Sequence, residues 1–199
     1  MNRLPHLLFI SCSLFCAAAP CRAQFSYSFN SGMNCYGDWR LPDTSTKPYS
    51  AVSGDDASYQ PAISSPSFAV NGNGTTIDNV TGLMWVSSSS ATMYNWQTAL
   101  SSCAGITAGS LNFGSGYAGY TDWRLPNVRE LMSIVDYGLY APAINSVAFP
   151  ATRVATPYWT STTYRPSVNN AVVVNFNTGG IMSLMKTASG YVKCVRGGP

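Results

Sequence analysis

From residue 67 onward, apolar positions follow two periods, one typical of β-strands and one typical of α-helices. Short apolar or β-branched runs at 67–70, 75–77 and 82–86 predict strands. The Asn-Gly-Asn-Gly string at 71–74 favours a tight turn, since Asn and Gly adopt positive φ at little energetic cost. We therefore expect a hairpin at the start of the folded domain.

A helical period begins at Asn95, which is a suitable N-cap residue. Positions i, i+3, i+4 and i+7 after it are apolar and fall on one helical face. These residues are Trp96, Ala99, Leu100 and Cys103. The pattern predicts a helix that ends on a buried cysteine.

A second helix is predicted after Asn127, because Glu130 lies three residues beyond it in a capping-box arrangement. Pro126 and Leu131 are spaced to form the accompanying hydrophobic staple. The expected buried face consists of Val128, Leu131, Met132 and Val135.

After residue 140 the pattern changes to strands, expected at 158–162, 171–176, 181–185 and 191–196, with a turn at 177–180. Strands, two helices and then a run of antiparallel strands indicate an α+β fold, with two helices packed on antiparallel strands.

The N-terminus resembles an export signal. Arg3 supplies one positive charge, and residues 4–19 are almost wholly apolar or small. We expect cleavage after Ala23, which gives a signal peptide at 1–23, an irregular N-terminal arm at 24–67 and a folded domain at 68–199. A lipid-anchored start is the weaker alternative, because Cys21 follows Pro20. No later stretch is apolar enough to span a bilayer, so we predict an exported chain that is periplasmic, surface-bound or extracellular.

Removal of the signal changes the composition. Of 11 basic residues, Arg3 and Arg22 are lost, which leaves 9 against 8 acidic residues, and the single histidine, His6, is lost as well. Of six cysteines, three remain: Cys35, Cys103 and Cys194. In an oxidising compartment this number suggests one disulfide and one further thiol. Charged residues make up only 10% of the whole chain, and this composition argues against a nucleic-acid partner.

The string Asp-Trp-Arg-Leu-Pro occurs twice, at 38–42 and at 122–126. The second copy precedes the capped helix, whereas the first precedes Asp43-Thr44-Ser45. Because a tandem repeat keeps its periodic surroundings, we interpret the first copy as a coincidence or a partial copy.

Five strings in this order resemble the C-terminal domain of the Legionella collagen-like protein and its secreted relatives. They are DNVTGLMW (78–85), NWQTAL followed by Cys103 (95–100), GYTDWRLPN (119–127), YWTST (158–162) and YVKCVR (191–196). The resemblance covers about residues 68–197. It implies a variant of the C-type-lectin-like fold, a fold shared with formylglycine-generating-type enzymes.

A disulfide between Cys103 and Cys194 would join the first helix to the last strand, as the lectin-like fold does. Such a link closes a loop of about 90 residues, which contributes roughly 4 kcal/mol on the chain-entropy model. Cys35 is then either a free thiol or the source of an intermolecular link.

The aromatic and capping residues of these strings have a structural interpretation and a functional one. Arg124 could clamp an anionic ligand beside Trp123, but we favour a structural role in which Trp123 is core and Arg124 pairs with Asp122 or a helix-end carbonyl. Core packing is likewise expected for Trp85, Trp96 and Trp159.

The sequence predicts no metal, no cofactor and no enzymatic activity. The calcium-binding triplets of lectins are absent, and a hairpin turn explains Asn71, Asn73 and Asp78 better than a cation site does. The mature chain has no histidine and one glutamate, Glu130, at a helix cap. Formylglycine-generating chemistry needs a reactive cysteine pair, which the expected disulfide removes; that enzyme is the least favoured alternative.

Charge is unevenly distributed along the mature chain. Residues 24–119 hold two basic and five acidic residues, a net charge of −3, whereas residues 120–199 hold seven basic and three acidic residues, a net charge of +4. Four late basic residues can either converge on one face and attract a sulfated polysaccharide or be scattered. They are Arg153, Arg165, Lys186 and Lys193. The resemblance also implies glycosaminoglycan binding and trimerisation, although the Gly-X-Y stem of the founder is missing here.

We therefore predict an exported, adhesin-like module that binds a glycan or another anionic surface ligand, and that can be oligomeric. The alternative is a structural or protein-interaction subunit of an envelope assembly. Tyr and Asn suit adaptable recognition surfaces. The candidate contacts are Arg153, Tyr158, Tyr164, Arg165, Asn169 and Lys186.

Overall fold

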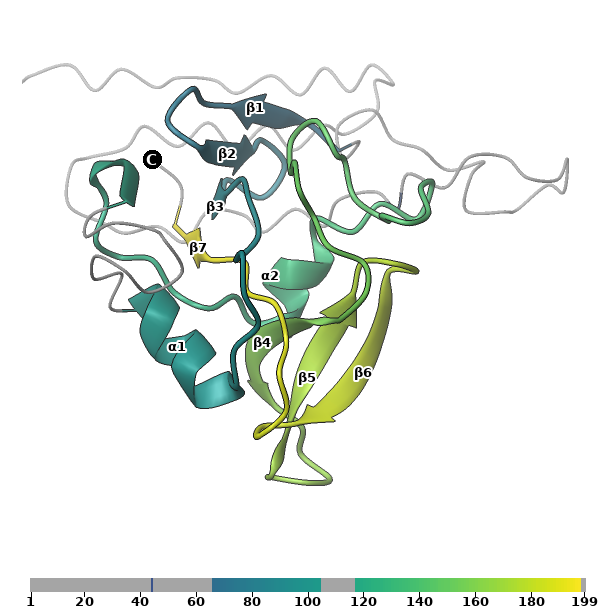
Figure 1. The fold of residues 1–199 in the computed structure, drawn as a ribbon. Helices are drawn as coiled ribbons and strands as arrows, with labels where there is room; N and C mark the ends of the chain where they lie inside the picture. Colours follow the sequence, from purple (N-terminus) through teal and green to yellow (C-terminus); the bar gives the residue numbers. More distant parts are fainter. Residues whose placement is uncertain (1–43, 45–65, 105–116, 198–199) are drawn as a thin grey trace, which may run out of the picture. The chain divides into compact units, whose positions relative to one another are not determined.

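Two antiparallel sheets and two short helices are present in the computed structural model, which describes residue 44, residues 66–104 and residues 117–197 (Figure 1). This arrangement confirms the α+β prediction, while the C-type-lectin-like comparison stays a prediction. The predicted signal peptide and Cys35 lie outside the described residues. From the predicted arm, Thr44 is described, and its carbonyl oxygen accepts a hydrogen bond of 2.9 Å from the backbone N–H of Tyr137.

The first sheet has the strand order β1-β2-β3-β7 and contains the predicted hairpin. Its strands are β1 (Phe68–Val70), β2 (Thr75–Asp78), β3 (Met84–Val86) and β7 (Val195–Arg196). The turn between β1 and β2 is closed by a 2.8 Å bond from the N–H of Asn71 to the carbonyl of Thr75, and Gly74 has a φ of +85°. That angle explains why glycine is needed at the end of this turn.

Asp78 organises the turn between β2 and β3. Its carboxylate accepts hydrogen bonds from the backbone N–H of Val80 at 2.9 Å and from the hydroxyl of Thr81 at 2.6 Å. Burial raises the pKa of Asp78, and these hydrogen bonds act in the opposite direction. The Asp-Asn-Val-Thr-Gly string therefore encodes a turn.

The second sheet is a meander with the order β4-β5-β6, whose strands are β4 (Tyr158–Thr163), β5 (Asn170–Asn175) and β6 (Gly180–Met185). The register of β4 against β5 shifts between Trp159 and Thr163, whereas β5 and β6 pair regularly from Asn170↔Met185 to Asn175↔Gly180. Among the described strands, β6 has no neighbour on its outer side.

The first helix, α1 (Trp96–Ala104), is capped as predicted, since the side-chain oxygen of Asn95 accepts a 2.9 Å bond from the N–H of Thr98. Ala99 and Cys103 are fully buried on its inner face. A short 3-10 turn, η2 (Tyr117–Gly119), lies further along the chain.

The second helix, α2 (Val128–Met132), has the predicted capping box but is shorter than predicted. It ends because the N–H of Ser133 bonds to the carbonyls of both Arg129 and Glu130, which closes the last turn. Val135 therefore lies beyond the helix, although it is buried as expected.

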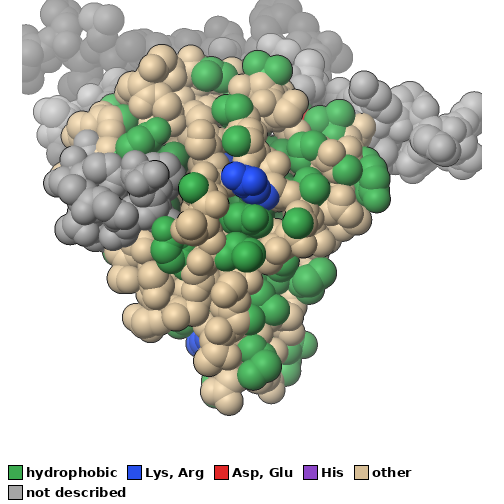
Figure 2. Space-filling model, in the orientation of Figure 1, with side chains coloured by type: hydrophobic (Ala, Val, Ile, Leu, Met, Phe, Trp, Pro, Cys, Tyr) green, Lys and Arg blue, Asp and Glu red, His purple; other side chains and the backbone are tan. Residues whose placement is uncertain are grey.

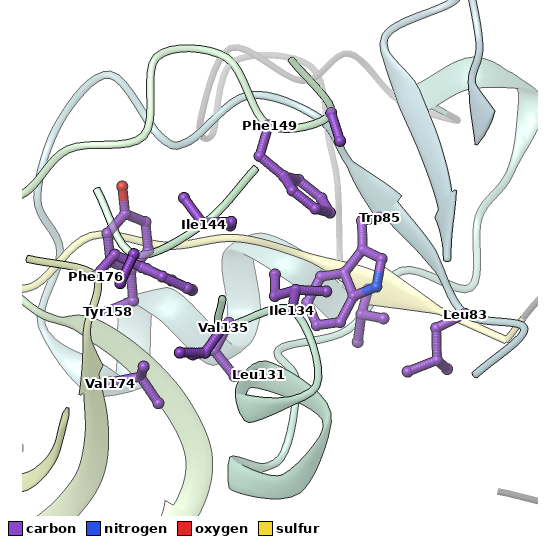
Figure 3. Close-up of a cluster of buried hydrophobic side chains, with 13 residues drawn as sticks. Leu83, Trp85, Leu131, Ile134, Val135, Ile144, Phe149, Tyr158, Val174 and Phe176 are labelled. Carbon is purple, nitrogen blue, oxygen red and sulfur yellow. The ribbon is translucent and has the colours of Figure 1, made fainter. Parts of the chain in front are cut away.

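Two clusters of buried apolar side chains form the core, and the strands contribute to both. In β3, Met84 and Val86 belong to the cluster beneath α1, whereas Trp85 points into the other cluster, shown in Figure 3. In β4, Trp159 and Tyr158 are divided in the same way. These strands are therefore buried on both faces.

The segment 190–196 connects the two sheets. Only Val195–Arg196 forms a regular strand, so the predicted strand at 191–196 is too long. The rest of the segment makes isolated bridges: Tyr94↔Gly190, Tyr158↔Tyr191 and Arg124↔Val195. The predicted disulfide between Cys103 and Cys194 is confirmed, with the two Cα atoms 5.6 Å apart. It joins α1 to this segment.

Candidate ligand-binding surface

The Arg-Leu-Pro-Asn string builds a rigid corner where the chain enters α2. The guanidinium of Arg124 donates to both carboxylate oxygens of Glu130 at 2.6 Å, and the backbone N–H of Asn127 donates to one of them at 2.8 Å. Asn127 in turn accepts a 2.9 Å bond from the N–H of Glu130. Because Glu130 is almost fully buried, its carboxylate depends on these donors for stabilisation.

The structural role predicted for Arg124 is therefore supported, but its ion-pair partner is Glu130, which we did not predict. Asp122 pairs instead with Arg196, whose Nε lies 2.7 Å from the carboxylate and whose guanidinium lies 3.9 Å from the ring centroid of Tyr120. The hydrogen bond from Arg196 holds the pKa of Asp122 below its usual value. Spacing along the chain could not identify this pair, because 74 residues separate its members.

The tryptophans of the motif strings have mainly structural roles. Trp85, Trp123 and Trp159 are buried, as predicted. Trp96 is only partly buried, and its ring nitrogen donates to the carbonyl of Thr160 at 2.8 Å. This bond ties the first turn of α1 to β4, and it leaves part of the Trp96 ring at the surface.

Two predicted surface residues are buried, which is a correction. Lys193 is fully buried; its Nζ donates to the carbonyl of Ser87 at 3.0 Å and lies 4.9 Å from the ring centroid of Phe149. Burial lowers the pKa of Lys193 to about 7. Tyr158 is also fully buried, and its hydroxyl oxygen lies 2.7 Å both from the hydroxyl of Ser89 and from the backbone nitrogen of Arg153. Neither side chain can reach a surface ligand in this conformation.

The remaining candidates divide between the two ends of β4. Arg153 lies near the beginning of this strand, with its guanidinium 6.0 Å from the ring centroid of Tyr191. The others lie at the far end of β4, which is about 17 Å long. The late basic residues therefore do not form one patch. In Figure 2 the Lys and Arg side chains likewise occupy only small, separate areas of the visible face.

Four candidate contacts do come together where β4, β5 and β6 end. We call Tyr164, Arg165, Asn169 and Lys186 the tip surface. The backbone N–H of Lys186 donates to the carbonyl of Asn169 at 2.8 Å, and the N–H of Tyr164 donates to the carbonyl of Asn170 at 2.9 Å. These bonds fix the β4–β5 loop against the end of β6.

The ammonium group of Lys186 has a defined position at the tip surface. It donates to the hydroxyl of Thr163 at 2.9 Å and lies 4.0 Å from the ring centroid of Trp96, which is a cation–π geometry. The backbone N–H of Trp96 also bonds to the carbonyl of Lys186 at 3.0 Å. Sequence reasoning missed Thr163 and Trp96 as parts of this surface. No local pattern in the sequence identifies these contacts, because both residues are far from Lys186 along the chain.

The tip surface carries positive charge that is not neutralised nearby. Across residues 66–104 and 117–197, the ion pairs are Arg124–Glu130 and Arg196–Asp122. Arg165 and Lys186 therefore have no ion-pair partner within these ranges. The exposed Tyr164 and Asn169 add an aromatic ring and an amide beside the two cations.

Within the described residues, no cluster of three His, Cys, Asp or Glu side chains could hold a metal ion. The described helices are also too short to cross a membrane. The chemistry available at the tip surface is thus ionic attraction, hydrogen bonding and aromatic contact.

Comparison with known protein families supports the motif analysis. The family model of the Lcl C-terminal domain matches residues 74–196, which include both sheets except β1, both helices and the disulfide. A comparison with curated proteins finds no match.

Proposed function

Since this chain belongs to the Lcl C-terminal domain family, we propose that it is an exported, adhesin-like module that binds an anionic glycan through the tip surface. The observation that carries this proposal is the pair of cations, Arg165 and Lys186, without an ion-pair partner in the described part of the chain. They lie beside an exposed tyrosine and an exposed asparagine, which suit adaptable recognition of a polar surface.

The geometry of Lys186 favours binding. A free lysine side chain loses rotamer freedom when it contacts a ligand, at a cost of about 0.5–1.5 kcal/mol. Contacts with Thr163 and Trp96 already restrict this side chain. A sulfate or carboxylate group that approaches the tip surface therefore meets an ammonium group that is partly preorganised.

Export is part of the proposal. Residues 4–19 have the composition of a signal-peptide core, and disulfides persist mainly in oxidising compartments. The Cys103–Cys194 link is consistent with such a compartment. The same link occupies the two thiols that a formylglycine-generating mechanism would require, so we propose a binding protein and not an enzyme.

Chromatography on immobilised heparin tests the proposal. We expect the mature chain to bind at low salt and to elute as the salt concentration rises, because salt screens exposed charges. In the double variant Arg165→Gln/Lys186→Gln, each lost cation is expected to weaken binding by roughly 1 kcal/mol, by analogy with basic residues at an anionic surface.

Arg153→Gln is the matched control, since it removes one exposed cation from the opposite end of β4. It should elute close to the unmodified chain. Failure of the unmodified chain to bind at low salt would overturn the anionic-glycan proposal. An Arg153→Gln shift as large as that of the double variant would exclude the tip surface as the site.

A second candidate function, a protein-interaction subunit of an envelope assembly, is favoured by the edge of β6. Ile181, Met182 and Met185 are 54%, 46% and 59% exposed there, and β6 carries no charged residue. An uncharged, unpaired edge strand is a surface to which another strand can add. Two results together would favour this alternative. Heparin would not retain the chain, and cross-linkers placed next to Met185 would capture a partner protein on intact cells.

A further inference from the structure

An open hollow of about 470 Å³ lies between α1 and the corner that precedes α2. Its volume falls within the range of small-molecule sites in proteins, about 300–1,000 Å³. The lining is an apolar set surrounded by polar side chains. The apolar residues are Leu100, Ala104 and Leu125, and the polar ones are Gln97, Ser101, Arg124, Asn127 and Ser161.

The hollow has no net charge. Arg124 is the basic residue of the lining, and the carboxylate of Glu130 holds both of its terminal nitrogens at 2.6 Å. An ion pair of this geometry leaves little field to attract an anion. The hollow thus differs from the tip surface, where Arg165 and Lys186 lack an ion-pair partner among the described residues.

Hydrogen-bonding groups are nevertheless available around the hollow. Asn127 uses its side-chain oxygen for the cap of α2, while its amide nitrogen has no partner among the described residues. Among the described residues, the side-chain amide of Gln97 and the side-chain hydroxyl of Ser161 also make no hydrogen bond. Donors and acceptors therefore surround the apolar surface, which Leu100 and Ala104 provide because Leu125 is almost fully buried.

Three residues of the lining are held in place by their surroundings. Ser101 is two residues from the disulfide-bonded Cys103, and Asn127 is fixed by the capping box. The backbone N–H of Ser161 donates to the carbonyl of Pro126 at 2.8 Å, which joins β4 to the corner. A ligand that enters the hollow does not have to order these residues, so little binding energy is lost.

We propose that this hollow binds one uncharged, hydroxyl-rich ring, such as a hexose residue of a neutral glycan. One face of a sugar ring presents C–H groups that match the apolar lining, and its hydroxyls match the surrounding amides and hydroxyls. The inference goes beyond the proposed function, because it concerns other residues and a ligand without charge. Either site can bind if the other does not.

Titration of the ¹⁵N-labelled mature chain, followed by NMR, tests this inference. The probes are the methyl glycosides of glucose, galactose, mannose and N-acetylglucosamine. We expect at least one of them to cause saturable shift changes at the backbone amides of Ser101, Leu125 and Ser161. The dissociation constant should be insensitive to added salt, in contrast to heparin binding.

Two tyrosine substitutions on α1 separate binding in the hollow from binding elsewhere. Ser101→Tyr places a ring in the hollow and should abolish the shift changes. Thr98→Tyr adds the same bulk at an exposed position of α1 outside the lining, and should change the affinity by no more than about twofold, as for ordinary surface substitutions. Circular dichroism of both variants verifies that they fold.

The inference is overturned if none of the glycosides causes saturable shifts, or if the folded Ser101→Tyr variant still binds. Salt-dependent binding would also overturn it. The Arg165→Gln/Lys186→Gln variant should bind the glycoside normally, since neither residue lines the hollow. Loss of glycoside binding in that variant would assign the ligand to the tip surface and would contradict the proposal.

Discussion

The carboxylate of Glu130 accepts hydrogen bonds from both terminal nitrogens of Arg124, each at 2.6 Å. The two partners differ in environment, since the side chain of Arg124 is 44% exposed and that of Glu130 only 2%. A lysine has no planar fork and could not make this paired contact. The Arg-Leu-Pro-Asn string thus encodes a bidentate ion pair that holds the first turn of α2.

This asymmetry predicts that loss of the arginine is more damaging than neutralisation of the glutamate. Arg124→Met leaves a buried carboxylate with the backbone N–H of Asn127 as its remaining donor in the corner, and should lower the free energy of unfolding by about 3 kcal/mol. Glu130→Gln keeps an acceptor oxygen for Arg124 and for the backbone N–H of Asn127, and Arg124 can still bind water. We therefore expect the free energy of unfolding to fall by about 1 kcal/mol. Urea denaturation measures both. Equal losses of unfolding free energy in the two variants would contradict the asymmetry expected for this ion pair.

Lys193 predicts a specific pH dependence of stability. Its pKa is about 7 in the folded chain, against an ordinary value of 10.5. Between these values the unfolded chain binds the extra proton, so the free energy of unfolding rises with pH, by at most about 1.4 kcal/mol per unit. Below pH 7 both states are protonated, and Lys193 contributes no further change.

Lys193→Met isolates this contribution, because methionine fills a similar volume and does not titrate. The difference in unfolding free energy between the unmodified chain and the variant should grow in favour of the unmodified chain from pH 7 to pH 9. The tyrosines titrate equally in both proteins and cancel in the difference. A difference that does not vary with pH would show that burial does not lower the pKa of Lys193.

The disulfide predicts a large effect on stability. Cys103→Ala/Cys194→Ala removes a link across a sequence separation of 91 residues, which should lower the free energy of unfolding by about 4 kcal/mol in the chain-entropy model. Cys35→Ala makes the same chemical change without breaking this link, and serves as the control. A loss under about 1 kcal/mol in the double variant would indicate that packing alone fixes α1.

Features that depend on neighbouring residues could be predicted from the sequence. The Asn127–Glu130 capping box and the Asn95 cap are local patterns, and both are present. The end of α2 was harder to place, because the apolar period continues to Val135. The hydrogen bonds from Ser133 that close the last turn do not change the apolar period, so the sequence pattern does not reveal where the helix ends.

Features that depend on residues distant in sequence could not be predicted. In a strand, side chains point alternately to the two faces, so Lys193 lies on the face opposite to that of Val192 and Cys194. This pattern suggests that Lys193 is at the surface. In the structure the opposite side meets Ser87 and Phe149 and is buried as well. Tyr158 was misplaced for the same reason, since β4 packs on both faces. Strands buried on both faces do not show the pattern from which exposure is inferred.

The position of residues 190–196 also determines when this domain can complete its folding. They bridge to Tyr94, Arg124 and Tyr158, and they supply Cys194 to a partner 91 residues earlier. They are also the last residues of the matched domain to be synthesised. Until they are synthesised, the bridges between the two sheets cannot form and Cys103 cannot pair with Cys194. Because these contacts join residues far apart in sequence, they slow the folding of the domain.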